Sequence, residues 1–205
     1  MNKPKVPEQA HPLLMILSGP SGVGKDAVVS RMRSLGKPFR IVVTVTTRLK
    51  RHHETDGVDY FFRDRSAFKA MLLANEFLEW AEVYGNLYGT PKSQITEALE
   101  SGIDVVAKTD VQGAFSIRKL VADAVFVFLA PPNMEELAHR LSQRMTESPD
   151  AFRLRLETAE SEMKEADKFD HIVVNHEGKL DDAVAAIEKI AASERERLPP
   201  RRVQL

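Results

Sequence analysis

A glycine-rich segment near the start of the chain carries the first residues with an evident chemistry. It reads Gly19-Pro20-Ser21-Gly22-Val23-Gly24-Lys25 and matches G-x-x-x-x-G-K. Its glycines allow successive backbone N–H groups to turn toward phosphate oxygens, and its lysine brings a point charge to the terminal phosphates. The segment follows an apolar run at 13–18 and precedes a helical pattern at 26–35, which is the context that such a loop requires. It predicts a nucleoside triphosphate site.

The residue after this loop departs from the motif. Asp26 stands where Ser or Thr would place a hydroxyl on Mg²⁺. Asp26 is therefore a candidate metal ligand. An aspartate at a helix N-terminus is also favoured by the helix dipole alone, without any catalytic role, and both interpretations stay open at this stage.

The elements that must position the loop follow an alternating pattern. Apolar, β-branched runs predict strands at 13–18, 41–45, 104–107, 125–129 and 171–174. Helical patterns occur at 26–35, 92–100, 112–121, 135–144, 153–167 and 180–197. Strands that alternate with helices predict an α/β fold with a mostly parallel sheet covered on both faces.

Two regions interrupt this alternation. Residues 46–91 contain a short aromatic strand at 60–62, a helix at 66–74 and an extended segment at 79–83, which predict a small mixed α/β lobe. Residues 145–152 form a polar, proline-containing link that predicts a mobile flap. We expect residues 1–12 and 198–205 to be flexible ends of a single domain at 13–197.

The composition and net charge limit the classes of partner and site that we expect. The chain has 205 residues, a formal net charge of -1 and no cysteine. The charge gives no support to general binding of nucleic acid or of an acidic membrane, and the lack of cysteine excludes disulfides and thiolate metal sites. No apolar run approaches the roughly 20 residues that span a bilayer. We expect a cytoplasmic protein, and the oligomeric state stays open.

Several further motifs resemble guanylate kinases, in the same order and with similar spacing from about Leu13 to Ile190. They are Thr44-Val45-Thr46-Thr47-Arg48 with Arg51 and Glu54, Asp56–Phe62, Glu76–Ala81, Gly85–Thr90 and Asp110–Ala114. The resemblance implies a P-loop fold with a five-stranded parallel sheet, an inserted lobe at 46–91 that binds the nucleoside monophosphate, and a lid at about 140–156. It also implies transfer of phosphate from ATP to GMP, and to dGMP, in purine nucleotide metabolism, with Mg²⁺ as the expected cofactor.

The resemblance also implies roles for individual residues. Residues 19–26 and Asn175 would bind ATP, and the catalytic cations would be Lys25, Arg48, Arg144 and Arg155, with Arg140 at a further lid position. GMP would be bound by Thr44, Arg48, Arg51, Glu54, Tyr60, Glu79, Tyr88, Thr90 and Asp110. Arginine suits phosphate because its planar fork contacts two oxygens. Carboxylates suit guanine, since its N1–H and N2 amino groups are donors, whereas adenine offers an unprotonated N1.

A second departure accompanies Asp26. The family usually carries another carboxylate two residues before the position of Asp110, and this chain has Lys108 there. The two family positions together have a formal charge of -1, whereas Asp26 and Lys108 sum to zero. One hypothesis is that they form a compensating ion pair that alters how the site holds Mg²⁺. The alternative is that Asp26 ligates Mg²⁺ directly while Lys108 reaches a phosphate.

Two other functions compete with GMP phosphorylation. The departures at positions 26 and 108 would also fit a guanylate-kinase-like scaffold domain that binds partners without turnover. A related kinase that acts on a phosphorylated sugar is the second alternative. The intact glycine loop with Lys25 argues against a scaffold, and Glu79 with Asp110 argues against a base-free acceptor.

Overall fold

The computed structural model describes residues 11–142 and 149–205. Its main sheet has five parallel strands in the order β2-β7-β1-β8-β9. These strands are β1 (Leu14–Ser18), β2 (Arg40–Ile41), β7 (Val105–Lys108), β8 (Val125–Ala130) and β9 (His171–Val174). The predicted α/β class with a parallel sheet is therefore confirmed.

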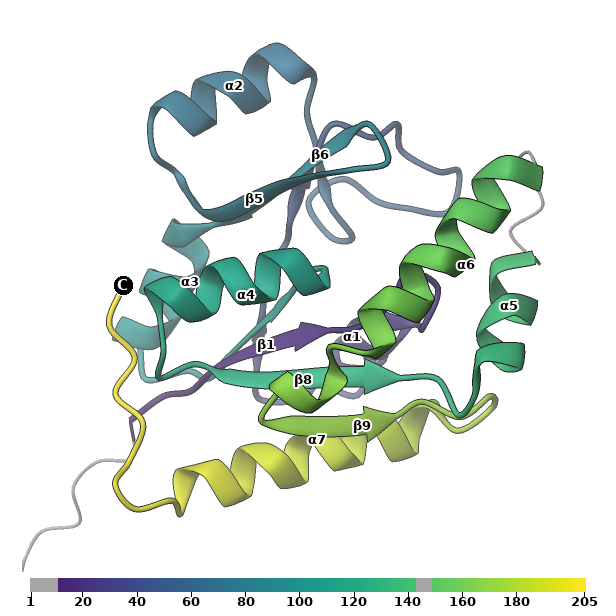
Figure 1. The fold of residues 1–205 in the computed structure, drawn as a ribbon. Helices are drawn as coiled ribbons and strands as arrows, with labels where there is room; N and C mark the ends of the chain where they lie inside the picture. Colours follow the sequence, from purple (N-terminus) through teal and green to yellow (C-terminus); the bar gives the residue numbers. More distant parts are fainter. Residues whose placement is uncertain (1–10, 143–148) are drawn as a thin grey trace, which may run out of the picture.

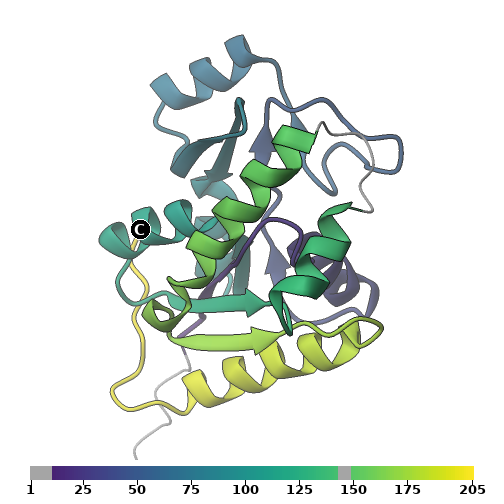
Figure 2. The same ribbon diagram turned by 45° about the vertical axis from the view of Figure 1, so that its right-hand side comes forward.

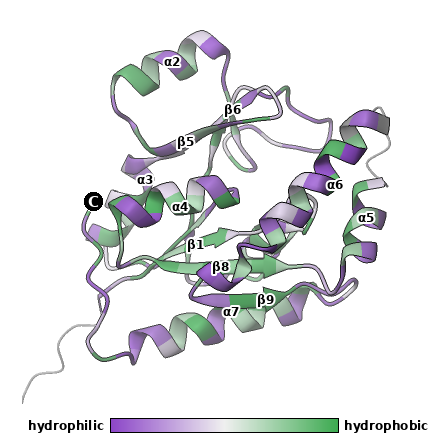
Figure 3. Ribbon diagram, in the orientation of Figure 1, coloured by the Kyte–Doolittle hydropathy of each residue, from purple (hydrophilic) through white to green (hydrophobic). Residues whose placement is uncertain are grey.

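Helices cover both faces of this sheet (Figure 1). They are α1 (Lys25–Ser34), α3 (Lys92–Glu100), α4 (Val111–Leu120), α5 (Met134–Ser142), α6 (Pro149–Met163) and α7 (Leu180–Arg195). Alternate residues of β1 point to opposite faces. Met15 and Leu17 belong to a core that includes α1 and α7, while Leu14 and Ile16 belong to a second core beneath α3 and α4. Figure 3 shows β1 and β8 as mainly hydrophobic and α7 as banded, as burial on one side requires.

A second sheet forms the smaller lobe above the main one (Figures 1 and 2). Its strand order is β4-β3-β6-β5. The lobe contains β3 (Val45–Thr46), β4 (Phe61–Phe62), α2 (Arg65–Leu73), β5 (Phe77–Val83) and β6 (Asn86–Pro91). Its own core contains Phe68 and Phe77, whose ring centroids are 4.6 Å apart. The second sheet and α2 therefore pack around a core of their own.

The strand predicted at 41–45 is wrong as one element. The chain leaves the main sheet after Ile41 and enters the second sheet at Val45, so the run contributes to two sheets. Between them, the side-chain amide of Gln94 accepts from the Val43 N–H at 2.9 Å and donates to the Val43 carbonyl at 3.0 Å. A side chain therefore satisfies backbone groups that a strand partner would otherwise bind.

The flap predicted at 145–152 lies partly outside the described residues, and its last part is helical. Helix α6 begins at Pro149 rather than at 153. A proline is compatible with the first turn of a helix because its missing N–H has no partner there. A short 3₁₀ helix at Ala166–Lys168 follows α6. No described helix has the length and apolar character that crossing a membrane requires.

Candidate active site

The glycine loop lies between β1 and α1, as predicted, and its glycines are required by geometry. Gly19 and Gly24 have φ angles of 138° and 104°, which L side chains rarely adopt. A Cβ on Gly19 would also lie 2.2 Å from the Leu129 carbonyl oxygen, and one on Gly24 would lie 2.5 Å from Asn175 Nδ2. The loop therefore packs too closely against β8 and the end of β9 to carry side chains at these positions.

Lys25 is folded back onto this loop. Its ammonium donates to the carbonyl oxygens of Gly19 and Pro20. Burial lowers the pKa of Lys25, and the nearby carboxylates of Glu162 and Asp26 oppose that shift. Lys25 therefore lies at the loop with its charge partly balanced by acids from two helices.

Glu162 of α6 is a site residue that the sequence reasoning missed. Its carboxylate lies near the Ser21 backbone N–H, and its Oε2 is buried with no hydrogen-bond partner among the described residues. Burial raises the pKa of Glu162, while Lys25 opposes the shift. A signal was available, because Glu162 follows Arg155 by seven residues and two helical turns return a side chain to the same face.

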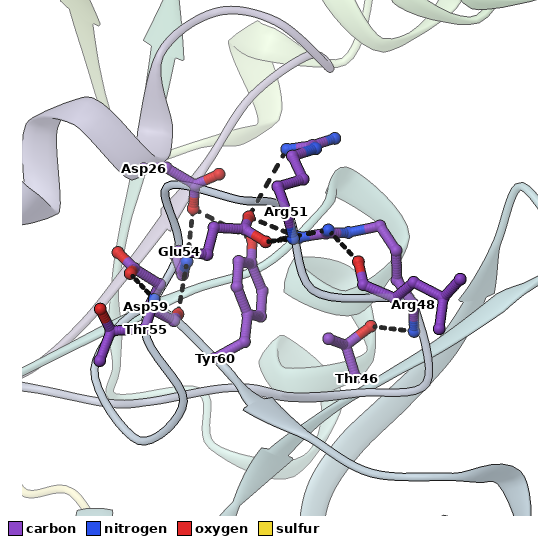
Figure 4. A network of polar contacts seen from close by, with 10 residues as sticks. Asp26, Thr46, Arg48, Arg51, Glu54, Thr55, Asp59 and Tyr60 are labelled. Atoms are coloured by element: carbon purple, nitrogen blue, oxygen red, sulfur yellow. Dashed lines mark hydrogen bonds and ion pairs between the residues drawn. The ribbon is translucent and has the colours of Figure 1, made fainter. Parts of the chain in front are cut away.

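Arg48 and Arg51 converge on Glu54 at the base of the second lobe (Figure 4). The guanidinium of Arg48 donates to both carboxylate oxygens of Glu54, and the Arg51 N–H donates to Glu54 Oε2 at 2.8 Å. Arg48 and Arg51 line the same cavity as the glycine loop. Glu54, expected to contact the ligand itself, instead holds the two arginines and is 7% exposed.

The two tyrosines predicted to reach a phosphate lie close together, with ring centroids 6.2 Å apart. Tyr88 lies beside Arg48. Burial lowers the pKa of the Arg48 guanidinium, but the hydrogen bond to Glu54 and the nearby Tyr88 outweigh burial and raise it. The Tyr60 hydroxyl donates to Asp26 Oδ1 at 3.0 Å (Figure 4). Tyr60 therefore links the second lobe to the residue after the glycine loop.

The acidic pair expected to recognise the base, Glu79 and Asp110, lines the same cavity. Glu79 Oε1 accepts from Thr90 at 2.8 Å and from Thr109 at 3.1 Å, while its Oε2 is buried with no partner among the described residues. Burial raises the pKa of Glu79 to about 7, with Asp110 adding to the rise and the two threonines opposing it. Thr109 is a second residue that the sequence reasoning missed.

Asp110 and Thr44 complete this side of the cavity. Asp110 caps α4, since its Oδ1 accepts the Gly113 N–H at 2.7 Å. Thr44 is 5% exposed, and its hydroxyl has no partner among the described residues. Buried polar atoms without a partner are rare, so the free Glu79 Oε2 and Thr44 Oγ1 indicate donors and acceptors that a ligand would satisfy.

Asp26 and Lys108 lie in contact, and their side chains form an ion pair. Burial raises the pKa of Asp26, but the charge of Lys108 and its hydrogen bond outweigh burial and bring that pKa to about 2. The described residues contain no cluster of three or more His, Cys, Asp and Glu side chains that would hold a metal ion. With Asp26 Oδ1 already bound by an ammonium and a phenol, these residues do not fit a divalent ion held by the protein.

The three arginines predicted at lid positions differ in their place relative to the cavity. Arg155 on α6 lines the cavity and lies over the Tyr84 ring, 4.9 Å from its centroid. Arg140 on α5 instead donates to the backbone carbonyls of Val23 and Asn175, which places it behind the glycine loop. Arg144 lies outside the described residues. Asn175 also supports the loop from behind, because its Nδ2 donates to the Val23 carbonyl at 2.8 Å.

These groups surround one cavity of about 340 Å³ between the main sheet, the second lobe and α6. Its lining contains both the glycine loop with Lys25 and the group Glu79, Thr109 and Asp110. Arg48, Arg51 and Lys108 lie along it. The arrangement offers cations to anionic groups and carboxylates to the hydrogen-bond donors of a polar ring.

Comparison with known proteins gives one consistent result. The guanylate kinase family model matches residues 11–194. A guanylate kinase from Halalkalibacterium halodurans is 42% identical over 194 residues, covering 93% of this chain and 94% of that protein. Guanylate kinase 2, chloroplastic/mitochondrial, from Oryza sativa subsp. japonica is 41% identical over 195 residues, covering 95% of this chain and 68% of that protein.

A solved structure agrees with these sequence relatives. The crystal structure of guanylate kinase from Anaplasma phagocytophilum aligns with a TM-score of 0.74 and 29% identity, covering 92% of this chain and 89% of that one. The match extends over the main sheet and the second lobe together, since so little of either chain is left uncovered. This chain belongs to the guanylate kinase family.

Proposed function

We propose that this chain transfers the terminal phosphate of ATP to GMP, and also to dGMP, with ADP and a guanosine diphosphate as products. The observation that carries the proposal is a single cavity lined by both the phosphate loop with Lys25 and the acids Glu79 and Asp110. Membership of the guanylate kinase family supports the same reaction. A cytoplasmic location stays a prediction.

The reaction needs positioning and charge rather than a general base. The second pKa of a phosphate monoester is about 6, so the acceptor phosphate is largely a dianion near neutral pH. One of its oxygens attacks the γ-phosphorus, and the bond between that phosphorus and the β–γ bridging oxygen breaks with its electrons passing to ADP. The two polyanions repel each other, so cations must hold them in line.

The cations of the cavity divide between the two substrates. Lys25 and the loop N–H groups would hold the terminal phosphates of ATP, as in other loops of this type. Arg48, Arg51 and Tyr88 would hold the GMP phosphate, and Arg155 would approach from α6. Mg²⁺ generally accompanies ATP in such transfers, and we expect it to arrive on the nucleotide.

Selection of guanine would rest on Glu79. Within the part of the chain that the structure describes, Glu79 Oε2 is buried without a partner, so an ionised Glu79 can accept from guanine N1–H or its N2 amino group. Adenine would leave that acceptor facing a lone pair, and sites built on such contacts reject the wrong ligand strongly. Thr90 and Thr109 hold Glu79 in position through its other oxygen.

A coupled assay of ADP release tests the proposal. With ATP present, GMP should give turnover, while AMP and ribose 5-phosphate should give rates at least about a hundredfold lower. The Lys25→Met variant should lose turnover but keep GMP affinity, because Lys25 lies at the ATP end. GMP binding by wild-type protein without ADP release would favour a scaffold, and equal rates with ribose 5-phosphate would favour a sugar phosphate kinase.

A further inference from the structure

Lys108 is an unusual residue for its place in the fold. It ends β7, next to β1 in the middle of the main sheet, and pairs in register with Leu17. It is 6% exposed, although lysine is almost never fully buried unless its charge is paired. Its side chain nevertheless lines the cavity that holds the glycine loop. A buried positive charge is therefore built into the centre of the site.

Two separate segments hold this charge in position, one at Asp26 and one at Asp59 and Tyr60. The Lys108 ammonium donates to Asp26 Oδ1 and lies 3.4 Å from the Asp59 carbonyl oxygen. It also lies 3.8 Å from the centroid of the Tyr60 ring, a distance at which the ring face attracts a cation. Because Tyr60 donates to the same Asp26 oxygen, the ammonium, carboxylate and phenol fix one another.

The same contacts bear on how the site handles Mg²⁺. This ion needs close oxygen ligands at about 2.0–2.1 Å in near-octahedral geometry. Asp26 Oδ1 already accepts from two donors, one of them a cation. A divalent ion at that oxygen would have to displace the ammonium and would then lie beside its charge. Asp26 therefore fits the role of anchoring Lys108 better than that of binding a metal.

We propose that the Lys108 ammonium is a resident cation of the phosphate site, held by Asp26 and Tyr60, which supplies the charge that the protein would otherwise hold as a divalent ion. The inference rests on the proposed function, since it assumes that ATP binds at the glycine loop. Asp26 is a positioning residue in this arrangement. The consequence is that ATP binds almost as well without a divalent ion as with one.

Calorimetric titration with ATP alone, in excess EDTA and in excess Mg²⁺, tests this consequence. For wild-type protein we expect the two dissociation constants to agree within about threefold, which is a difference of under 1 kcal/mol. Lys108→Met keeps the length of the side chain but removes its charge, so ATP affinity in EDTA should fall about tenfold. Lys108→Arg keeps a cation, so its ATP affinity in EDTA should fall less.

A double variant gives the sharpest comparison. Asp26→Ser with Lys108→Asp restores the hydroxyl and carboxylate that the family resemblance implies. Its affinity for ATP should become dependent on Mg²⁺, falling at least about tenfold in EDTA. Lys37→Met, which removes a lysine charge outside this cavity, is the matched control. It should leave the ratio of the ATP dissociation constants in EDTA and in Mg²⁺ unchanged. Thermal unfolding of each variant checks that it is folded.

The outcomes separate this inference from the proposed function. A tenfold or greater loss of wild-type affinity in EDTA would overturn the resident cation, as would a Lys108→Met affinity in EDTA equal to that of wild type. If Lys108→Met does not fold, the wild-type ratio and the double variant still decide. If ATP binds in EDTA but the coupled assay shows no phosphorylation of GMP, only the proposed function is rejected. No ATP binding under either condition would reject both.

Discussion

Arg48 and Glu54 form a two-point ion pair in which Nη2 lies 2.7 Å from Oε1 and Nη1 lies 3.1 Å from Oε2. The Arg48 side chain is 16% exposed and that of Glu54 is 6% exposed, so solvent screens the pair little. Burial raises the pKa of Glu54, but hydrogen bonds from Arg48 and from the Arg51 backbone outweigh it and lower that pKa. Glu54 therefore fixes the guanidinium that we propose for the GMP phosphate.

The Glu54→Gln substitution tests this positioning role. The amide keeps the shape but loses the charge and one acceptor, so the Arg48 fork is no longer held at two points. We expect KM for GMP to rise about tenfold, corresponding to about 1.4 kcal/mol, while affinity for guanosine stays unchanged because it has no phosphate. Steady-state kinetics and guanosine titration measure the two effects. Glu100→Gln on the exposed face of α3 is the control. An unchanged KM would contradict the role.

Binding of guanine should depend on the ionisation of Glu79. Burial raises the pKa of this carboxyl to about 7, so the ligand-free site holds a proton below that pH. Guanine donors need the ionised form, and affinity must therefore rise with pH and level off above 7. Guanosine is the suitable ligand because it has no phosphate that titrates in this pH range. It should bind roughly tenfold more weakly at pH 6 than at pH 8.

The matched variant for this pH dependence is Glu79→Gln. It cannot ionise, so its affinity for guanosine should be weak and flat between pH 6 and pH 8. Guanosine titrations across that range, with both proteins, give the comparison. A wild-type profile as flat as that of the variant would show that Glu79 does not carry the pH dependence.

The features of the fold that depend on a local sequence pattern could be predicted from the sequence. The glycine loop needs Gly19 and Gly24 at fixed spacing, and alternation in β1 follows from burial on both faces, so both are readable without a structure. The break after Ile41 is not readable in this way, because a β-branched run looks the same within one sheet or across two. It depends on Gln94, which lies 51 residues away from Val43 in sequence.

The residues of the candidate site also differ in whether the sequence could predict them. Arg48, Glu79 and Asp110 could be proposed because they belong to recurring motifs. Arg140 also belongs to such a motif, yet it supports the loop from behind, since its orientation depends on how α5 packs. Glu162 and Thr109 belong to no recurring motif, and only the seven-residue spacing from Arg155 pointed to Glu162. Both enter the site because α6 and the end of β7 lie beside the loop and Glu79.

Glu162 should compete with the triphosphate for the glycine loop. Its carboxylate lies near the Ser21 N–H and near Lys25, both of which phosphate oxygens would bind. We expect Glu162→Gln to bind ATP roughly three- to tenfold more tightly, because a neutral amide competes less well for a donor and a cation. Calorimetry with ATP measures the change. Glu160→Gln, two residues away on the exposed face of α6, is the control. Weaker binding by Glu162→Gln would indicate that the carboxylate assists ATP instead.

The end of the chain offers a test of stability that is independent of the active site. Flexibility of 198–205 stays a prediction, but Arg201 within it is 9% exposed and donates to Glu194 at 2.7 Å and to the Ala124 carbonyl at 2.9 Å. Burial raises the pKa of Glu194, while Arg201 and His171 outweigh it and bring that pKa to about 2. The tail is therefore tied to α7 and to the start of β8.

Arg201→Ala leaves the Glu194 carboxylate buried with only part of its partners. Breaking a buried pair costs about 3 kcal/mol, so we expect the unfolding midpoint to fall by about 6–12 °C without a change in KM for GMP. A lowered carboxyl pKa stabilises the fold above its unfolded value of about 4.5, and this contribution is lost as pH falls toward 2. The difference between wild type and variant should therefore shrink between pH 5 and pH 2. Thermal unfolding across that range measures it, with Lys189→Ala on the exposed face of α7 as control. A difference that stays constant with pH would mean that the Glu194 charge is not what Arg201 stabilises.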